Sequence, residues 1–342
     1  MNKSNWTIRS RAPLRVSFAG GGTDIKEYYE KYGGVVISSS ISKYAYATLR
    51  PLKDGKFRIR QENLGIDYSG KINEKLTDTQ ELGFLNAIVR HFSPKDGFDL
   101  ITHSDVNYGS GLGASSTMIV AIVGAFNKWL NLDLDHYEIA ETAYKIERED
   151  LGIKGGAQDQ YAASFGGFNF IEFMRDAIIV NQMRLKPSTI YDLQFRLLMV
   201  HTGSSHSSSR ILSTQINKLS DSQLLEHYDR LKRLAVDVKG ALYKDDLDTI
   251  GPLLKQEWEE KKLLSPGIST KEIEKIINVA YENGASGAKV LGAGGGGYAL
   301  LFTDEDNRFR LANAMQKLGV EANYPEFDYG GLETWSLYKK GR

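Results

Sequence analysis

The sequence predicts an α+β protein in which helices cover one side of mostly antiparallel sheets. Segments with the alternating or β-branched pattern of strands are mixed with amphipathic helical segments, without the regular alternation of βαβ proteins. Long helical patterns gather in the second half of the chain, at about residues 221–243, 247–264 and 271–282. A chain of 342 residues is long enough for about two domains.

The first predicted domain comprises residues 1–187 and opens with a strand. Residues 8–18 alternate and run into Gly20-Gly21-Gly22-Thr23-Asp24, where the glycines permit a tight turn and Thr-Asp can begin a helix. The same patterns predict the remaining helices and strands of this domain. They are helices at 25–32, 81–92, 137–150 and 157–164, a helix directly after residue 116, and strands at 35–49, 98–102, 168–173 and 177–180.

The second predicted domain comprises residues 188–342. We place the boundary at Lys186-Pro187-Ser188, because proline is typical of a break between elements. A strand at 195–200 precedes the three long helices, and residues 289–302 are predicted as two strands joined by a run of glycines. A helix near 309–318 and a strand near 334–338 complete the domain.

The composition excludes several classes of function. The 43 Lys and Arg residues cancel the 43 Asp and Glu residues, so no overall field favours nucleic acid or an anionic membrane as a partner. The chain has no cysteine, which excludes disulfides, thiolate metal sites and a thiol nucleophile. The N-terminus lacks the apolar core of a signal peptide, and no apolar run is long enough to span a membrane. We therefore expect a cytoplasmic protein.

A glycine-rich loop that enters a helix, residues 109–116, is the first candidate site. Glycines let backbone N–H groups approach an anion closely, and the helix that follows directs its positive end to the same place. Ser115 and Ser116 fall in the first helical turn, where they could ligate Mg²⁺ or cap the helix. No lysine follows the last glycine, so the loop is not a Walker A motif. An ordinary turn with a serine cap is the alternative.

Two carboxylates are further candidates. Glu147 lies on the apolar stripe of its helix, where a carboxylate is costly unless it is paired or bound to a metal. An ion pair with an arginine or lysine is the alternative for this residue. Asp159 follows the glycine break at 155–156 and could take a proton from an acceptor hydroxyl, or it could simply begin a helix.

The glycines at 294–297 and the residues around the first turn complete the candidates. Four consecutive glycines exceed what a hairpin needs, so a ligand or another backbone segment is expected to come very close. Arg15 could hold a phosphoryl group, and Asp24 could bind sugar hydroxyls. The two residues could also form a structural ion pair.

Three segments, taken in order, resemble the three motifs of the GHMP superfamily of small-molecule kinases. They are residues 12–24, 109–116 and 289–297. The resemblance spans nearly the whole chain. It implies an N-terminal domain with a left-handed βαβ crossover, like domain 2 of ribosomal protein S5, and a ferredoxin-like C-terminal domain with the active site between them.

The resemblance also implies ATP and Mg²⁺ as cofactors and a role for each motif residue. Asp159 would be the catalytic base, and Arg15 would act on the phosphoryl group. The residues assigned to ATP are Gly109, Ser110, Gly111, Leu112, Gly113, Ala114, Ser115 and Ser116; those assigned to Mg²⁺ are Ser115 and Glu147; and those assigned to the acceptor are Gly21, Gly22, Thr23, Asp24, Gly294 and Gly295.

Within the superfamily, residues 18–24, 155–163 and 166–169 resemble the bacterial kinases of D-glycero-α-D-manno-heptose 7-phosphate. This resemblance implies phosphorylation of the anomeric hydroxyl to a 1,7-bisphosphate, on a route to nucleotide-activated heptose. Galactokinases carry Glu-His where this chain has Gly21-Gly22, and the loss of two side chains would enlarge the sugar pocket.

An acceptor that carries its own phosphate needs a second cationic subsite. The candidates are Lys26, Lys43, Lys154, His206 and Arg210, and the serine-rich segment 202–210 could line this subsite or be a helix-capping loop. Three other functions are left open: a kinase for a fucose-like or galactose-like sugar, a non-catalytic sensor of sugar and ATP, and an RNA-binding module, which the zero net charge disfavours. A homodimer is also left open.

Overall fold

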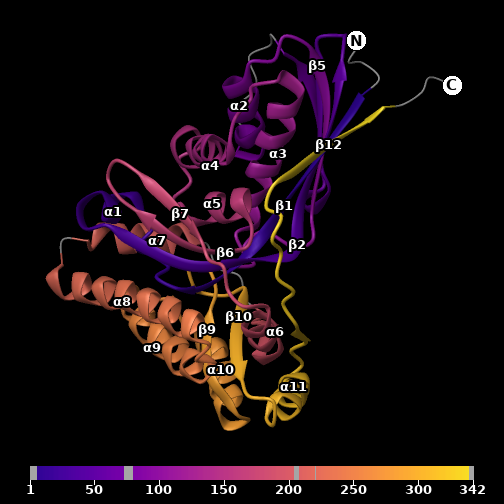
Figure 1. The fold of residues 1–342 in the computed structure, drawn as a ribbon. Coiled ribbons are helices and arrows are strands. Elements are labelled where there is room, and N and C mark those ends of the chain that lie inside the picture. The colour runs from indigo at the N-terminus through magenta and orange to yellow at the C-terminus, as the bar shows by residue number, and fades with distance from the viewer. Residues whose placement is uncertain (1–5, 73–79, 204–207, 220, 339–342) are drawn as a thin grey trace.

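The described strands form two sheets in the computed structural model, which describes residues 6–72, 80–203, 208–219 and 221–338 (Figure 1). The larger sheet has eight strands in the order β12-β1-β2-β5-β3-β4, with β6 and β7 extending from β2. Its strands are β1 (Trp6–Ala19), β2 (Gly34–Leu52), β3 (Lys56–Gln61), β4 (Ile66–Lys71), β5 (Gly97–Ser104), β6 (Phe168–Phe173), β7 (Ile178–Gln182) and β12 (Glu333–Tyr338).

The larger sheet is held together by its two longest strands. β2 pairs antiparallel with β1, β5 and β6, and only β3 and β5 run parallel among the described pairs of this sheet. Figure 1 shows its helices gathered on one side of the sheet. They are α2 (Gln80–Phe92), α3 (Ala114–Leu130), α4 (His136–Tyr144) and α5 (Gln158–Phe165). α3 is apolar on almost every side because it lies in the middle of this layer.

The smaller sheet has the ferredoxin-like arrangement. Its strands occur in the chain as β8 (Leu197–His201), β9 (Ala285–Val290), β10 (Tyr298–Thr303) and β11 (Ala322–Asn323). Their spatial order β11-β8-β10-β9 places the fourth strand beside the first and the third beside the second, with helices after the first and third strands. These helices are α8 (Ser222–Lys244), α9 (Ile250–Leu263), α10 (Lys271–Glu282) and α11 (Arg308–Lys317).

The predicted α+β class is confirmed, and most predicted elements are present. The sequence prediction missed the β3–β4 hairpin, the short strand β11, and two helices, α6 (Pro187–Arg196) and α7 (Ser208–Asn217). The helix predicted at 137–150 is α4 followed by a π-helical segment, Lys145–Asp150. α6 begins at the predicted domain boundary, and the last described strand, β12, returns to the larger sheet beside β1. The division at residue 187 stays a prediction.

Two glycine turns bring the halves of the chain together backbone to backbone. A Cβ atom on Gly111 would lie 2.6 Å from the carbonyl oxygen of Leu291, and one on Gly292 would lie 2.7 Å from the Cα atom of Gly111. The φ angles of +78° and +71° also favour glycine at these two positions. Close by, the N–H group of Tyr298 donates to the carbonyl oxygen of Ser110 at 2.8 Å. The loop at 109–116 is thus fixed against the turn between β9 and β10.

A buried ion pair lies beneath this junction. The ammonium group of Lys289 lies 2.8 Å from Glu257 Oε1 and donates at 2.9 Å to the carbonyl oxygen of Phe18. Both charged side chains are fully buried, so the pair links α9 and β9 to the end of β1. Burial lowers the pKa of Lys289 to about 8, and the neighbouring carboxylate of Glu257 opposes this shift.

No helix in the described part of the chain is long and apolar enough to cross a membrane.

We predict that Gly292→Ala lowers the free energy of unfolding by roughly 2–5 kcal/mol. The added methyl group meets the backbone of Gly111, and a left-handed conformation costs a non-glycine residue about 1–2 kcal/mol. Gly319→Ala is the matched control, because Gly319 has a φ of +76° and nothing within 4 Å of the added atom. Urea unfolding should show only the conformational cost in the control. Equal losses in the two variants would contradict the packing argument.

Candidate active site

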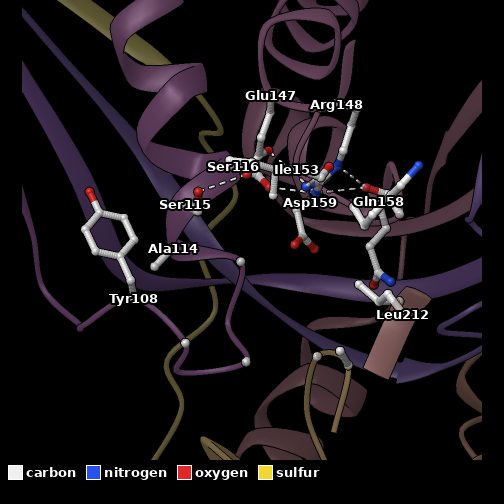
Figure 2. A pocket seen from close by; sticks show the side chains of 18 of the residues that line it. Tyr108, Ala114, Ser115, Ser116, Glu147, Arg148, Ile153, Gln158, Asp159 and Leu212 are labelled. Carbon is white, nitrogen blue, oxygen red and sulfur yellow. Dashed lines mark hydrogen bonds and ion pairs between the residues drawn. The ribbon is translucent and has the colours of Figure 1, made fainter. Parts of the chain in front are cut away.

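A cleft of about 430 Å³ opens where the two glycine turns meet. Its walls come from the turn between β1 and α1 (Lys26–Tyr32), the loop at 109–116, the π-helical segment, the start of α5, and α9. Figure 2 shows Ser115, Glu147 and Asp159 close together above the loop, with Tyr108 on the opposite side of Ala114. Segments that are distant in the sequence therefore share one cavity.

The glycine loop leads into the N-terminus of α3, which faces this cleft. Gly109, Gly111 and Gly113 all have positive φ angles, and Gly113 is the N-cap of α3. Among the described residues, no side chain caps this helix, so the alternative of a serine cap is wrong. Unpaired N–H groups in the first turn of a helix, together with the helix dipole, favour an anion at this point.

Arg15 holds Asp159 at the mouth of the loop. Its Nε and Nη2 atoms lie 2.8 Å and 2.6 Å from Asp159 Oδ1, and Nη1 donates at 2.7 Å to the carbonyl oxygen of Gly111. Arg15 is buried, whereas the Asp159 side chain keeps 18% of its surface exposed and points into the cleft (Figure 2). The predicted structural pair of Arg15 with Asp24 is wrong, since Arg15 pairs with Asp159 instead.

Glu147 lies on the other side of the loop in the π-helical segment, a rare geometry that is frequent at functional sites. Its Oε1 atom accepts from the Ser115 hydroxyl at 2.9 Å, and its Oε2 atom accepts from the Gln160 amide at 2.7 Å. Arg148 lies 3.5 Å away, so this buried carboxylate has the cationic neighbour that the alternative interpretation required. Glu147 Oε1 and the Ser115 hydroxyl nevertheless meet at the cleft.

The turn after β1 places Asp24 at the cleft. Its carboxylate accepts from the N–H group of Gly22 at 3.0 Å and from both the backbone and the side-chain amide of Gln158 at 3.1 Å. Gly21, Gly22 and Asp24 line the cleft. Thr23 is fully buried, and its hydroxyl donates to the carbonyl oxygens of Gly20 and Val35, so it holds the shape of the turn.

The second glycine run forms a hairpin and also approaches other parts of the backbone closely. Gly292 and Ala293 line the cleft. Gly294 and Gly295 pack instead against Ile268, whose carbonyl oxygen accepts from the N–H group of Gly295 at 2.7 Å. The structure therefore brings the beginning of the run to the cleft, whereas Gly294 and Gly295, which the sequence assigns to the acceptor, contact Ile268 and do not line the cleft.

The sequence prediction missed Lys261 and Gln158, which also line the cleft. Lys261 is only 4% exposed and donates to the carbonyl oxygen of Gly292 at 2.7 Å. Burial lowers the pKa of Lys261, and the carboxylates of Glu257, Asp24 and Asp159 oppose this shift. Lys261 precedes Lys262 on a charged helix, so no pattern in the sequence distinguishes it from a surface lysine.

The cations predicted to bind a second phosphate are dispersed. Lys154 lines the cleft, with its ammonium group 3.8 Å from Glu27. Lys26 pairs with Glu149 at 3.3 Å. Lys43 lies on β2, and Arg210 is exposed on α7. His206 lies outside the described residues.

Two family models match the chain: the N-terminal domain of GHMP kinases at residues 82–167 and the C-terminal domain of GHMP kinases at residues 238–321. The chain belongs to the GHMP kinase family, and its class is that of phosphotransferases with an alcohol group as acceptor. This confirms the family and the enzyme class that the three motifs predicted.

Relatives with heptose substrates are similar over their full length. The chain is 41% identical over 339 residues to D-glycero-alpha-D-manno-heptose 7-phosphate kinase of Campylobacter jejuni, which covers 97% of this chain and 99% of the relative. A crystal structure described as a D-glycero-D-manno-heptose 1-phosphate kinase from Bacteroides thetaiotaomicron matches with a TM-score of 0.81 and 32% identity, over 97% of this chain and 100% of the other. Mevalonate kinase from Methanococcus jannaschii shares the fold. It matches with a TM-score of 0.73 and 20% identity, over 93% of this chain and 98% of the other.

We predict that Arg15→Lys lowers the free energy of unfolding by roughly 1.5–3 kcal/mol. One ammonium group cannot replace the fork that contacts both Asp159 and Gly111, and hydrogen bonds to charged groups are worth about that much. Arg11→Lys on the same strand is the control, since its pair with Glu333 is exposed and worth at most about 1 kcal/mol. Similar losses in both variants, measured by urea unfolding, would argue against this role of Arg15.

Proposed function

We propose that this kinase transfers the γ-phosphoryl group of ATP to the anomeric hydroxyl of D-glycero-α-D-manno-heptose 7-phosphate. The product is the 1,7-bisphosphate, which would serve the cytoplasmic synthesis of nucleotide-activated heptose. The observation that carries the proposal is the position of Asp159 beside the glycine loop, in a chain similar over its full length to a heptose 7-phosphate kinase.

The loop and the start of α3 are suited to the phosphates of ATP. The N-cap glycine leaves the helix terminus open, and Ser115 and Ser116 line the cleft beside it. Leu64, Phe84, Tyr108 and Met118 also line the cleft, and apolar and aromatic side chains of this kind suit a nucleotide base. Burial raises the pKa of Tyr108 to about 12.

Ser115 and Glu147 fit a magnesium ion. The hydroxyl oxygen and Glu147 Oε1 lie 2.9 Å apart at the cleft, and both are the hard oxygen ligands that Mg²⁺ prefers. The described residues contain no cluster of three or more His, Cys, Asp or Glu side chains for a metal, so nucleotide oxygens and water would complete the shell. Bound there, the ion would neutralise charge on the phosphates.

We assign the remaining groups to the transfer step. Asp159 takes the proton of the acceptor hydroxyl, the hydroxyl oxygen bonds to the γ-phosphorus, and the bond to the ADP oxygen breaks. Arg15 fixes Asp159 through Oδ1 and places its positive charge beside the phosphoryl group in transfer. Both groups are held in position before substrate binds, so little reorganisation is needed during the reaction.

We predict that Asp159→Asn lowers kcat by about 10²–10⁴-fold, because an amide cannot accept the proton. ATP affinity, measured by calorimetry, should stay close to that of the unchanged protein, since the loop and α3 are left intact. Asp176→Asn, at an exposed turn residue, is the control and should keep full turnover. Near-normal turnover in Asp159→Asn would end the assignment of the base.

The acceptor is tested by a substrate panel at equal concentrations, with ADP release as the readout. The panel contains heptose 7-phosphate, heptose 1-phosphate, unphosphorylated heptose, fucose and galactose. We expect kcat/KM to be roughly 10–100-fold higher for heptose 7-phosphate than for unphosphorylated heptose, the amount that charged hydrogen bonds to its phosphate supply. Phosphorus NMR of the product should place the new phosphate at C1. A preference for any other sugar would overturn the proposed acceptor.

A further inference from the structure

Lys261 is an unusual residue in this cleft. It is a lysine with 4% exposure that reaches the site from α9, in the second half of the chain. An ammonium group has three N–H donors, and the one hydrogen bond described for it goes to the carbonyl oxygen of Gly292. A buried charge with unused donors is costly, so a fold is expected to keep one only where something else uses those donors.

The position of Gly21 gives Lys261 its access to the cleft. A Cβ atom on Gly21 would lie 3.3 Å from the ammonium nitrogen of Lys261 and 3.7 Å from Nε2 of Gln158. All three residues line the cavity. Glycine at residue 21 therefore does more than enlarge the pocket. It also leaves the polar groups of Gln158 on α5 and Lys261 on α9 accessible to a ligand in the cleft.

Gln158 and Asp24 complete a polar group around Gly21. The Gln158 amide nitrogen donates to Asp24 Oδ2 at 3.1 Å, and its buried Oε1 atom has no partner among the described residues. The group thus offers the donors of Lys261 beside the acceptor oxygens of Gln158 and Asp24. A hydroxyl both donates and accepts, so neighbouring hydroxyls of a sugar match this set.

We propose that Lys261, together with Gln158 and Asp24, binds the sugar hydroxyls next to the one that is phosphorylated. This inference rests on the proposed function in that the acceptor is a sugar. The ammonium nitrogen of Lys261 lies beside Gly21, in the turn that carries Asp24, so we assign its remaining donors to the acceptor. The second half of the chain then contributes directly to the choice of acceptor.

The test is Lys261→Met, assayed with whichever sugar of the panel the unchanged protein phosphorylates best. We expect the KM for that sugar to rise about 10–100-fold, the factor that corresponds to losing hydrogen bonds from a charged donor. The KM for ATP should change less than about twofold. Lys262→Met is the matched control, since Lys262 pairs with Glu259 at 2.9 Å and does not line the cleft; both KM values should stay unchanged.

Gly21→Ala tests the same subsite without removing the bond between Lys261 and Gly292. The backbone at Gly21 is not in the left-handed region, so alanine is tolerated, but its methyl group meets the head of Lys261 at 3.3 Å. We expect a raised sugar KM with an unchanged midpoint of thermal unfolding. An unchanged sugar KM in this variant would overturn the proposed subsite even if Lys261→Met does not fold.

The outcomes separate this inference from the proposed acceptor. A preference of the unchanged protein for another sugar overturns the heptose 7-phosphate proposal, while Lys261→Met can still be judged on that sugar. A raised KM for ATP alone, or a lower melting temperature with normal kinetics, overturns the role of Lys261. Failure of the unchanged protein to phosphorylate any sugar overturns both.

Discussion

The contact between the backbones of Gly111 and Gly292 is the constraint on which the site depends. Neither position has room for a Cβ atom, so the loop at 109–116 and the turn between β9 and β10 are held at a distance that only glycine permits. Arg15 donates to the carbonyl oxygen of Gly111, and Lys261 donates to that of Gly292. Arg15 and Lys261 are therefore each positioned by one side of this contact.

Charges in and beneath the cleft are stabilised by specific partners. Arg15 is paired with Asp159, Glu147 is bonded to Ser115 and Gln160, and the Lys289–Glu257 pair lies below them. Leaving any one of these buried charges unpaired would be costly, so their geometry is tightly specified. Such fixed charges suit phosphoryl transfer, which depends on positioning and on charge neutralisation more than on covalent chemistry.

Both halves of the chain contribute residues to the site. The first half supplies the open end of α3, the carboxylates Glu147 and Asp159, and the turn that carries Asp24. The second half supplies the glycine turn and Lys261 from α9. Since β12 returns to pair with β1, both ends of the described chain meet in the larger sheet (Figure 1). The strands of the smaller sheet come between β7 and β12 in the sequence.

The sequence by itself determined the α+β class, the GHMP family and the order of the three glycine-rich motifs, because glycine runs and apolar periodicity are local signals. It missed β3 and β4, whose short alternating runs are weak signals, and it did not reveal that Arg15 pairs with Asp159. Only the tertiary structure decided which side chains meet. Asp159 and Arg15 are 144 residues apart in sequence, and a surface-like lysine at 261 becomes part of the cleft because α9 packs against the turn at Gly292. Such contacts depend on how the two sheets dock, which no local pattern encodes.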